Sequence, residues 1–182
     1  MSKPYHPPLA IGDRTYTFPH LEPFRMAVGC RNAGKDLQVH IRFTTHCFTT
    51  KYDADIHPAG EPVIRESGGR PRTFCPIRYY LSERLPALIL ALNHPKATVM
   101  QTAEERNWLH SVTVDDPAGK YHIFFELRRA APELRHLQDL NLVVESAYPQ
   151  GAMLRTPAVR GSMGFVVLCG KVYKGEPIAT RR

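Results

Sequence analysis

Several polar residues along the chain have the side chains that RNA cleavage without a metal ion requires. Such cleavage needs a base that takes the proton of the 2′-hydroxyl, an acid that protonates the leaving 5′-oxygen, and cations or hydroxyl groups that stabilise the additional negative charge. Histidine, arginine, serine and tyrosine suit these roles. The residues of these types that we consider, together with one carboxylate, are His46, Arg78, Arg84, Glu126, Ser146 and Tyr148.

Two of these residues continue an apolar pattern in the segment 140–148. Leu140, Leu142 and Val144 alternate with other positions, which is typical of a strand with one buried face, and the same spacing continues into Ser146 and Tyr148. We expect Ser146 and Tyr148 to lie on the same side of the strand as these core residues, beyond the end of the core, and to line a groove there. The structural alternative is that Tyr148 packs its ring at the sheet edge and Ser146 bonds to the backbone.

A zinc site is a second reading of the same region. His46, Cys47 and Cys75 have the nitrogen and thiolate ligands that zinc requires, and they form the alternative metal site. Their spacing matches no zinc module, and adjacent residues of an extended chain point to opposite sides. We therefore expect no metal and buried free thiols. The four cysteines are scattered without a CxxC pair, so no disulfide framework is expected.

The charge of the chain favours an anionic partner. Lys and Arg number 24 against 17 Asp and Glu, which gives a formal net charge of +7. We predict RNA contacts through the backbone phosphates from Arg84, Arg155, Arg160 and Lys171. The alternative is a basic surface without a dedicated ligand, because the excess is spread along the chain.

The secondary-structure elements expected from the sequence would position these residues within one α+β domain spanning residues 1–182. Residues 1–36 are rich in Pro and Gly and are expected to be irregular, and residues 37–75 to form a strand, 37–43, and a long loop. From Pro76 apolar residues recur at helical spacing, and Pro86 predicts a kink or two short helices. Four or five antiparallel strands should follow within 76–174, with the last strand at 164–173.

No segment is apolar over the roughly 20 residues that a membrane span needs, and the N-terminus lacks the apolar core of a secretory signal. The sequence therefore favours the cytoplasm and no membrane partner.

The order of helix and meander, with Val143-Val144-Glu145-Ser146-Ala147-Tyr148-Pro149 closing a late strand, resembles the RelE, barnase, EndoU and colicin-like ribonuclease toxin superfamily. The resemblance covers about residues 76–149. It implies that Ser146 and Tyr148 contact the scissile phosphate, that His46 acts as base, and that Arg78 binds the phosphate. The chain departs from the family in its long N-terminal part and in the segment after the late strand.

These observations make a metal-independent endoribonuclease of bacterial or phage toxin type the first hypothesis, with His46, Arg78, Ser146 and Tyr148 as catalytic residues, no cofactor, RNA as substrate and a protein antitoxin as partner. The second is a non-catalytic basic module that binds nucleic acid or a protein. The third is a zinc-stabilised binding domain. The sequence predicts no oligomeric state.

Overall fold

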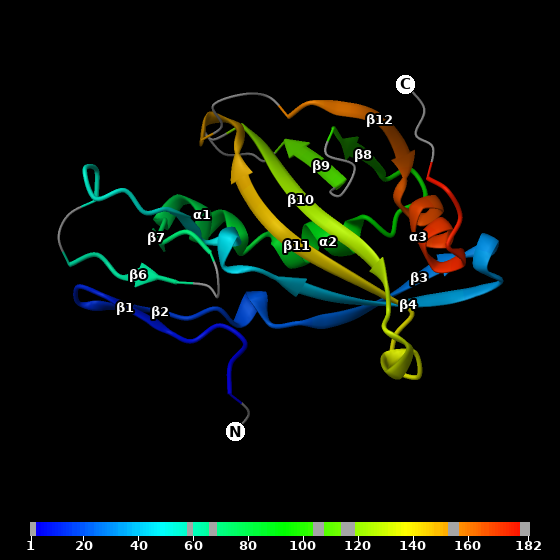
Figure 1. The fold of residues 1–182 in the computed structure, drawn as a ribbon, viewed down its shortest axis with the longest axis horizontal. Helices are drawn as coiled ribbons and strands as arrows, with labels where there is room; N and C mark the ends of the chain where they lie inside the picture. The colour runs from blue at the N-terminus through cyan, green and yellow to red at the C-terminus, as the bar shows by residue number, and fades with distance from the viewer. Residues whose placement is uncertain are drawn as a thin grey trace.

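The fold is built around one long, twisted sheet of seven strands (Figure 1). The computed structural model describes residues 3–57, 60–65, 69–103, 108–113, 119–152 and 157–178. The strand order across the sheet is β12-β8-β9-β10-β11-β4-β3. The strands are β3 (Phe24–Cys30), β4 (Lys35–Phe43), β8 (Thr98–Thr102), β9 (Trp108–Thr113), β10 (Lys120–Arg129), β11 (Leu140–Pro149) and β12 (Val159–Gly164).

Strands β8 to β11 form the predicted antiparallel meander, in which each strand pairs with its neighbour in sequence. The sheet as a whole is mixed, because β11 pairs in parallel with β4. Strand β3 pairs antiparallel with β4 at one edge, and β12 pairs antiparallel with β8 at the other. The long polypeptide between β4 and β11 makes this parallel pairing possible, since parallel neighbours need a crossover connection.

Two small sheets lie beside the central one. The first pairs β1 (Leu9–Ile11) with β2 (Arg14–Tyr16), and the second contains β5 (Thr49–Lys51), β6 (Val63–Ile64) and β7 (Arg72–Phe74). Short 3-10 helices connect several strands. They are η1 (Pro19–Leu21), η2 (Arg31–Ala33), η3 (Thr45–Cys47), η4 (Pro132–Leu134) and η5 (Gln150–Ala152).

Three α-helices complete the fold: α1 (Pro76–Ser82), α2 (Leu85–Ala91) and α3 (Phe165–Lys174). The predicted interruption at Pro86 is confirmed as two short helices, with Pro76 and Pro86 each in a first turn, where a missing N–H breaks no helical bond. None of the described helices is long and apolar enough to cross a membrane. In Figure 1, α2 lies behind β10 and β11, and α3 lies against β3 and β12.

The core fills the space between one face of the sheet and the helices. Strand β4 follows a strict period of two, with Leu37, Val39, Ile41 and Phe43 buried and the residues between them more exposed. Helix α3 adds Phe165, whose ring meets that of Phe125 edge-on at 6.1 Å between centroids. The other face of β4 and of its neighbours is therefore turned away from the core.

The α+β class is confirmed, but three details of the prediction are wrong. The strand predicted at 164–173 is replaced by α3 (Phe165–Lys174), because its apolar residues recur at helical spacing: Phe165, Leu168 and Cys169 are buried, and Gly175 ends the helix at a φ of +73°. The N-terminal third is not irregular, since it contains β1, β2 and the seven-residue β3. The central sheet has seven strands of mixed direction, not four or five antiparallel ones.

Candidate nucleic-acid interface

A β-bulge decides which way the predicted site residues of β11 point. Phe124 pairs with Ser146, but the next residue, Phe125, pairs with Val144, so Glu145 is the extra residue. Because side chains alternate along a strand, one extra residue moves every later side chain to the other face. Ala147 is buried as a result, and Ser146 lies on the face away from the core.

The expectation that Ser146 and Tyr148 continue the core face of Leu140, Leu142 and Val144 is therefore wrong. They continue the opposite face, on which Phe124 and His122 are their cross-strand partners. The sequence pattern carries no sign of the bulge, since the alternation looks unbroken from residue 140 to 148.

The chain segment after β4 holds the bulge in place. The backbone N–H of Thr44 donates to the carbonyl oxygen of Val144 at 3.0 Å, and its hydroxyl donates to the carbonyl oxygen of Glu145 at 2.7 Å. The same hydroxyl accepts a bond from the N–H of His46, which caps η3. Thr44 thus provides the hydrogen bonds that the interrupted ladder leaves open.

Thr44→Val is expected to lower the free energy of unfolding by about 1–2 kcal/mol, because valine keeps the shape of threonine but leaves these polar groups without the hydroxyl. Urea denaturation followed by circular dichroism measures the change. Thr15→Val, on the exposed part of β2, is the control and should change stability by less than about 0.5 kcal/mol. Equal stability of both variants would show that the Thr44 hydroxyl does not support the bulge.

Arg78 and Tyr148 lie together at the end of β11. The Arg78 guanidinium carbon is 4.8 Å from the centroid of the Tyr148 ring, and Nη1 of Arg78 donates to the carbonyl oxygen of His46 at 3.2 Å. The tyrosine ring is also stacked on Phe124, with 5.4 Å between centroids and 23° between ring planes. Burial raises the pKa of Tyr148, an effect that Arg78 partly opposes, so its hydroxyl stays protonated at neutral pH.

Ser146 and Tyr148 line a cavity of about 320 Å³, together with Thr102, Phe124 and Pro157. Of the predicted catalytic set, the structure therefore brings Arg78, Ser146 and Tyr148 to one place, with the backbone of His46 beside them. The sequence analysis did not select His122, although the period of two in β10 puts it on the same face as Phe124. It lies directly opposite Tyr148 and is 4% exposed, and burial lowers its pKa.

The zinc hypothesis for His46, Cys47 and Cys75 is wrong. Cys47 is fully buried, and its Sγ faces the carbonyl oxygen of Val144 at 3.8 Å. Burial raises the pKa of this thiol to about 12. Within the described residues, no three His, Cys, Asp or Glu side chains are grouped so that they could hold a metal ion.

The predicted RNA-binding residues lie on different elements of the fold. Arg84 precedes α2, Arg160 lies on β12, and Lys171 lies on α3, where it donates to the carbonyl oxygen of Pro177 at 3.1 Å and pairs with Glu176 at 3.7 Å. Arg155 lies outside the described residues.

A different basic surface lies on the face of the sheet away from the core. Along β3, β4, β11 and β10 the cross-strand pairs are Arg25 with His40, His40 with Asn141, and Asn141 with Arg128. We call the residues on this side the open sheet face; they are Arg25, Gln38, His40, Arg42, Asn141, Arg128, Phe124, Ser146 and Tyr148. The alternation of Leu37 to Phe43 indicated that His40 and Arg42 point away from the core, but not which residues of other strands lie beside them.

The positive charge of this face comes from three arginines on three strands, β3, β4 and β10. Arg25, Arg42 and Arg128 are exposed and His40 is half-buried. The pKa of His40 is lowered by burial and by the charges of Arg42 and Arg25, an effect that a hydrogen bond to the Asn141 side chain partly opposes. Glu126, which is 9% exposed, is paired with Arg128 at 2.6 Å.

Comparison with known proteins identifies one family model that matches the chain. The model of the YjaZ family matches residues 8–173, which include every residue of the open sheet face. No curated protein and no solved structure matches the chain. The family description names no activity.

Proposed function

The chain belongs to the YjaZ family, and we propose that it binds single-stranded RNA on the open sheet face. The observation that carries this proposal is the row of Arg25, His40, Asn141 and Arg128 on four neighbouring strands, with Arg42 two residues after His40 on β4. Neighbouring strands lie about 4.8 Å apart. Such a row can follow several phosphates of one nucleic-acid strand.

The aromatic pair on the same face supports a single strand rather than a duplex. Phe124 and Tyr148 are stacked on one another, and Tyr148 is half-buried. Proteins that bind single strands combine a basic track for the backbone with aromatic rings on which unpaired bases stack. In a duplex the bases are already stacked on each other and cannot reach such a ring.

Fluorescence anisotropy with a labelled 12-nucleotide polyuridine and a duplex RNA of equal length tests this proposal. We expect tighter binding of the single strand and an affinity that falls steeply with salt, since each phosphate contact adds about 0.7 to the slope of log K against log salt for single strands. Equal binding of both RNAs, or none to either at low salt, would refute it.

Binding should also depend on pH through His40. In the free protein the lowered pKa keeps His40 neutral at pH 7, and a phosphate beside it would raise that pKa. RNA affinity should therefore increase as the pH falls from 7.5 to 5.5, by up to about tenfold for each unit by which RNA raises the pKa. His40→Asn should flatten this profile. His136→Asn, at an exposed position, should retain it, and identical profiles in both variants would exclude His40 as the titrating group.

Cleavage of the bound RNA is the second candidate function, and the convergence of Arg78, Ser146 and Tyr148 favours it. Arg78 would stabilise the phosphate charge, and the protonated Tyr148 hydroxyl would donate to a phosphate oxygen or to the leaving oxygen. His46, or His122 opposite Tyr148, would take the 2′-hydroxyl proton. A toxin of this kind would require an antitoxin as protein partner.

Incubation with RNA and EDTA at pH 5 to 9 tests cleavage separately from binding. If the chain cleaves, Tyr148→Phe should slow the reaction at least about tenfold, because it removes the hydroxyl but keeps the ring that stacks on Phe124. His46→Ala and His122→Asn then identify the base. If RNA is bound but remains intact at every pH, the binding proposal stands and the nuclease proposal is excluded.

A further inference from the structure

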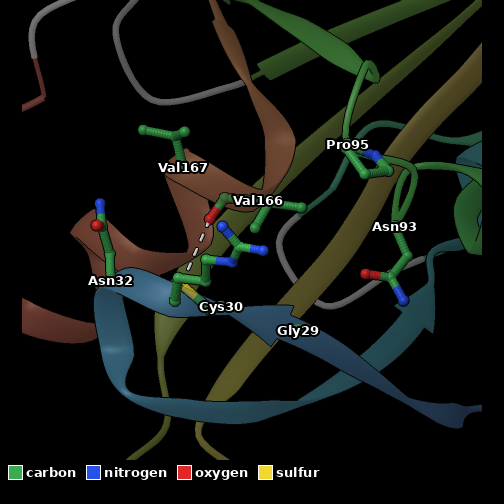
Figure 2. A pocket seen from close by; sticks show the side chains of 8 residues that line it. Gly29, Cys30, Asn32, Asn93, Pro95, Val166 and Val167 are labelled. Atoms are coloured by element: carbon green, nitrogen blue, oxygen red, sulfur yellow. Dashed lines mark hydrogen bonds between the residues drawn. The ribbon is translucent and has the colours of Figure 1, made fainter.

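A cavity of about 680 Å³ lies between the end of β3, the loop after α2 and the first turn of α3 (Figure 2). It is lined by Gly29, Cys30, Arg31, Asn32, Asn93, Pro95, Val166 and Val167. The residues of the open sheet face are not among its lining. Neither the family match nor the proposed function assigns it a role.

The backbone of β3 turns hydrogen-bonding groups toward this cavity. The side-chain amide of Asn93 donates to the carbonyl oxygen of Ala27 at 2.9 Å, so the polar backbone groups of Ala27 point away from β4. In an antiparallel pair the N–H and C=O of one residue point to the same side, and every second residue repeats that direction. The pairing of β3 with β4 has no register shift from Phe24 to Cys30. Gly29 therefore presents its N–H and C=O on the cavity side.

The side-chain amide of Asn93 donates to the carbonyl oxygen of Ala27, as the backbone N–H of an adjacent strand would. Gly29 is the next residue of β3 whose backbone polar groups point to this edge. It leaves room for an added strand, because it has no side chain. A Cβ placed on Gly29 would have only the Asp36 carboxylate within 4 Å, at 3.6 Å. Unprotected strand edges are the places where extended peptides add to a sheet.

The opposite wall of the cavity is apolar and held firmly. Pro95, Val166 and Val167 form it, and Val167 is 43% exposed. The thiol of Cys30 donates to the carbonyl oxygen of Val166 at 3.7 Å, and a Cβ on Gly170 would come within 2.9 Å of that sulfur. Helix α3 is thus seated directly on β3, and the width of the cavity is set by the fold.

Charge indicates the kind of segment that fits. Arg31 is the charged residue in the lining, and the chain carries a net charge of +7. A second copy adding through the same edge would bring two copies of Arg31, the residue directly after β3, toward each other, and like charges on paired segments are destabilising. An acidic segment would instead meet Arg31, provided that its carboxylate avoids Asp36 beside Gly29.

We propose that this cavity binds an extended acidic segment of a partner protein, which adds to the edge of β3 at Gly29 and places a carboxylate against Arg31. The apolar side chains of the segment, alternating with the acidic ones, pack on Val166 and Val167. The inference is independent of RNA binding.

A labelled octapeptide of alternating Val and Glu tests the proposal by fluorescence anisotropy with the full chain. Two probes control for pairing and charge: the same peptide with alternate backbone nitrogens methylated, and the corresponding Val–Lys peptide. We expect the Val–Glu peptide to bind at least about tenfold more tightly than either. A methylated or Val–Lys peptide that binds as well would overturn the proposal.

Two protein variants locate the site. Gly29→Pro removes the N–H on the cavity side without touching the β3–β4 bonds, since proline is tolerated on edge strands, and it should weaken binding about tenfold. Arg31→Glu should do the same, whereas the matched Arg14→Glu, on exposed β2, should change it little. Thermal melting controls for folding, and if Gly29→Pro does not fold, Arg31→Glu and the methylated peptide decide. Wild-type affinity in Arg31→Glu, or peptide-induced dimerisation through this edge, would refute the assignment.

Discussion

Replacing Arg25 and Arg42 together with glutamine is expected to weaken binding of single-stranded RNA about 30-fold at low salt. Each arginine that contacts a phosphate contributes on the order of 1 kcal/mol, and 1.4 kcal/mol corresponds to a factor of ten. Both side chains are exposed on the open sheet face: Arg25 is the cross-strand partner of His40, and Arg42 lies two residues after His40 on β4. The slope of log K against log salt should also decrease by about 1.4, since two contacts are lost at about 0.7 each.

The control for this prediction removes the same charge from another part of the surface. Arg14→Gln combined with Lys51→Gln changes two exposed residues of β2 and β5. If affinity depended only on net charge, the two double variants would lose affinity equally. Such a result would mean that RNA does not lie along the open sheet face, whereas a loss confined to Arg25 and Arg42 supports the location.

Deleting Glu145 is expected to lower the free energy of unfolding by about 1–2 kcal/mol and to leave Tyr148 on the open sheet face. Without the extra residue, the pairs Phe125–Val144 and Phe124–Ser146 would follow one another directly, so Ser146 and Tyr148 would keep their present side of the sheet. Ala147 would stay buried in the core. Thr44 would also lose its partner at Glu145.

Glu145→Ala separates the length of β11 from the chemistry of the residue. This substitution keeps the bulge, so Ser146 and Tyr148 should stay on the open sheet face and stability should change by less than about 1 kcal/mol. Urea denaturation and RNA anisotropy on both variants measure the difference. Equal stability of the deletion and the substitution would mean that the bond from the Thr44 hydroxyl to the backbone of residue 145 does not stabilise this strand.

Much of the fold follows from local patterns. The period of two from Leu37 to Phe43 predicted β4, and the prolines at 76 and 86 predicted where two helices begin. The segment 164–173 was predicted wrongly because a short apolar run fits a buried strand and a buried helix equally well. The buried residues Phe165, Leu168 and Cys169 face the core one helical turn apart, and the lysines at 171 and 174 complement the helix C-terminus.

The sequence by itself determined the α+β class, the meander, and the residue types at the end of β11. Only the tertiary structure decided which side those residues face, because a bulge adds one residue without changing the visible alternation. It also decided where the basic surface lies. The parallel pairing of β4 with β11 joins Arg25 and His40 to Arg128, and a contact between strands so far apart in sequence leaves no local pattern. Ser146 and Tyr148 thus lie on the same face as a row of polar and basic residues that no local sequence pattern predicts.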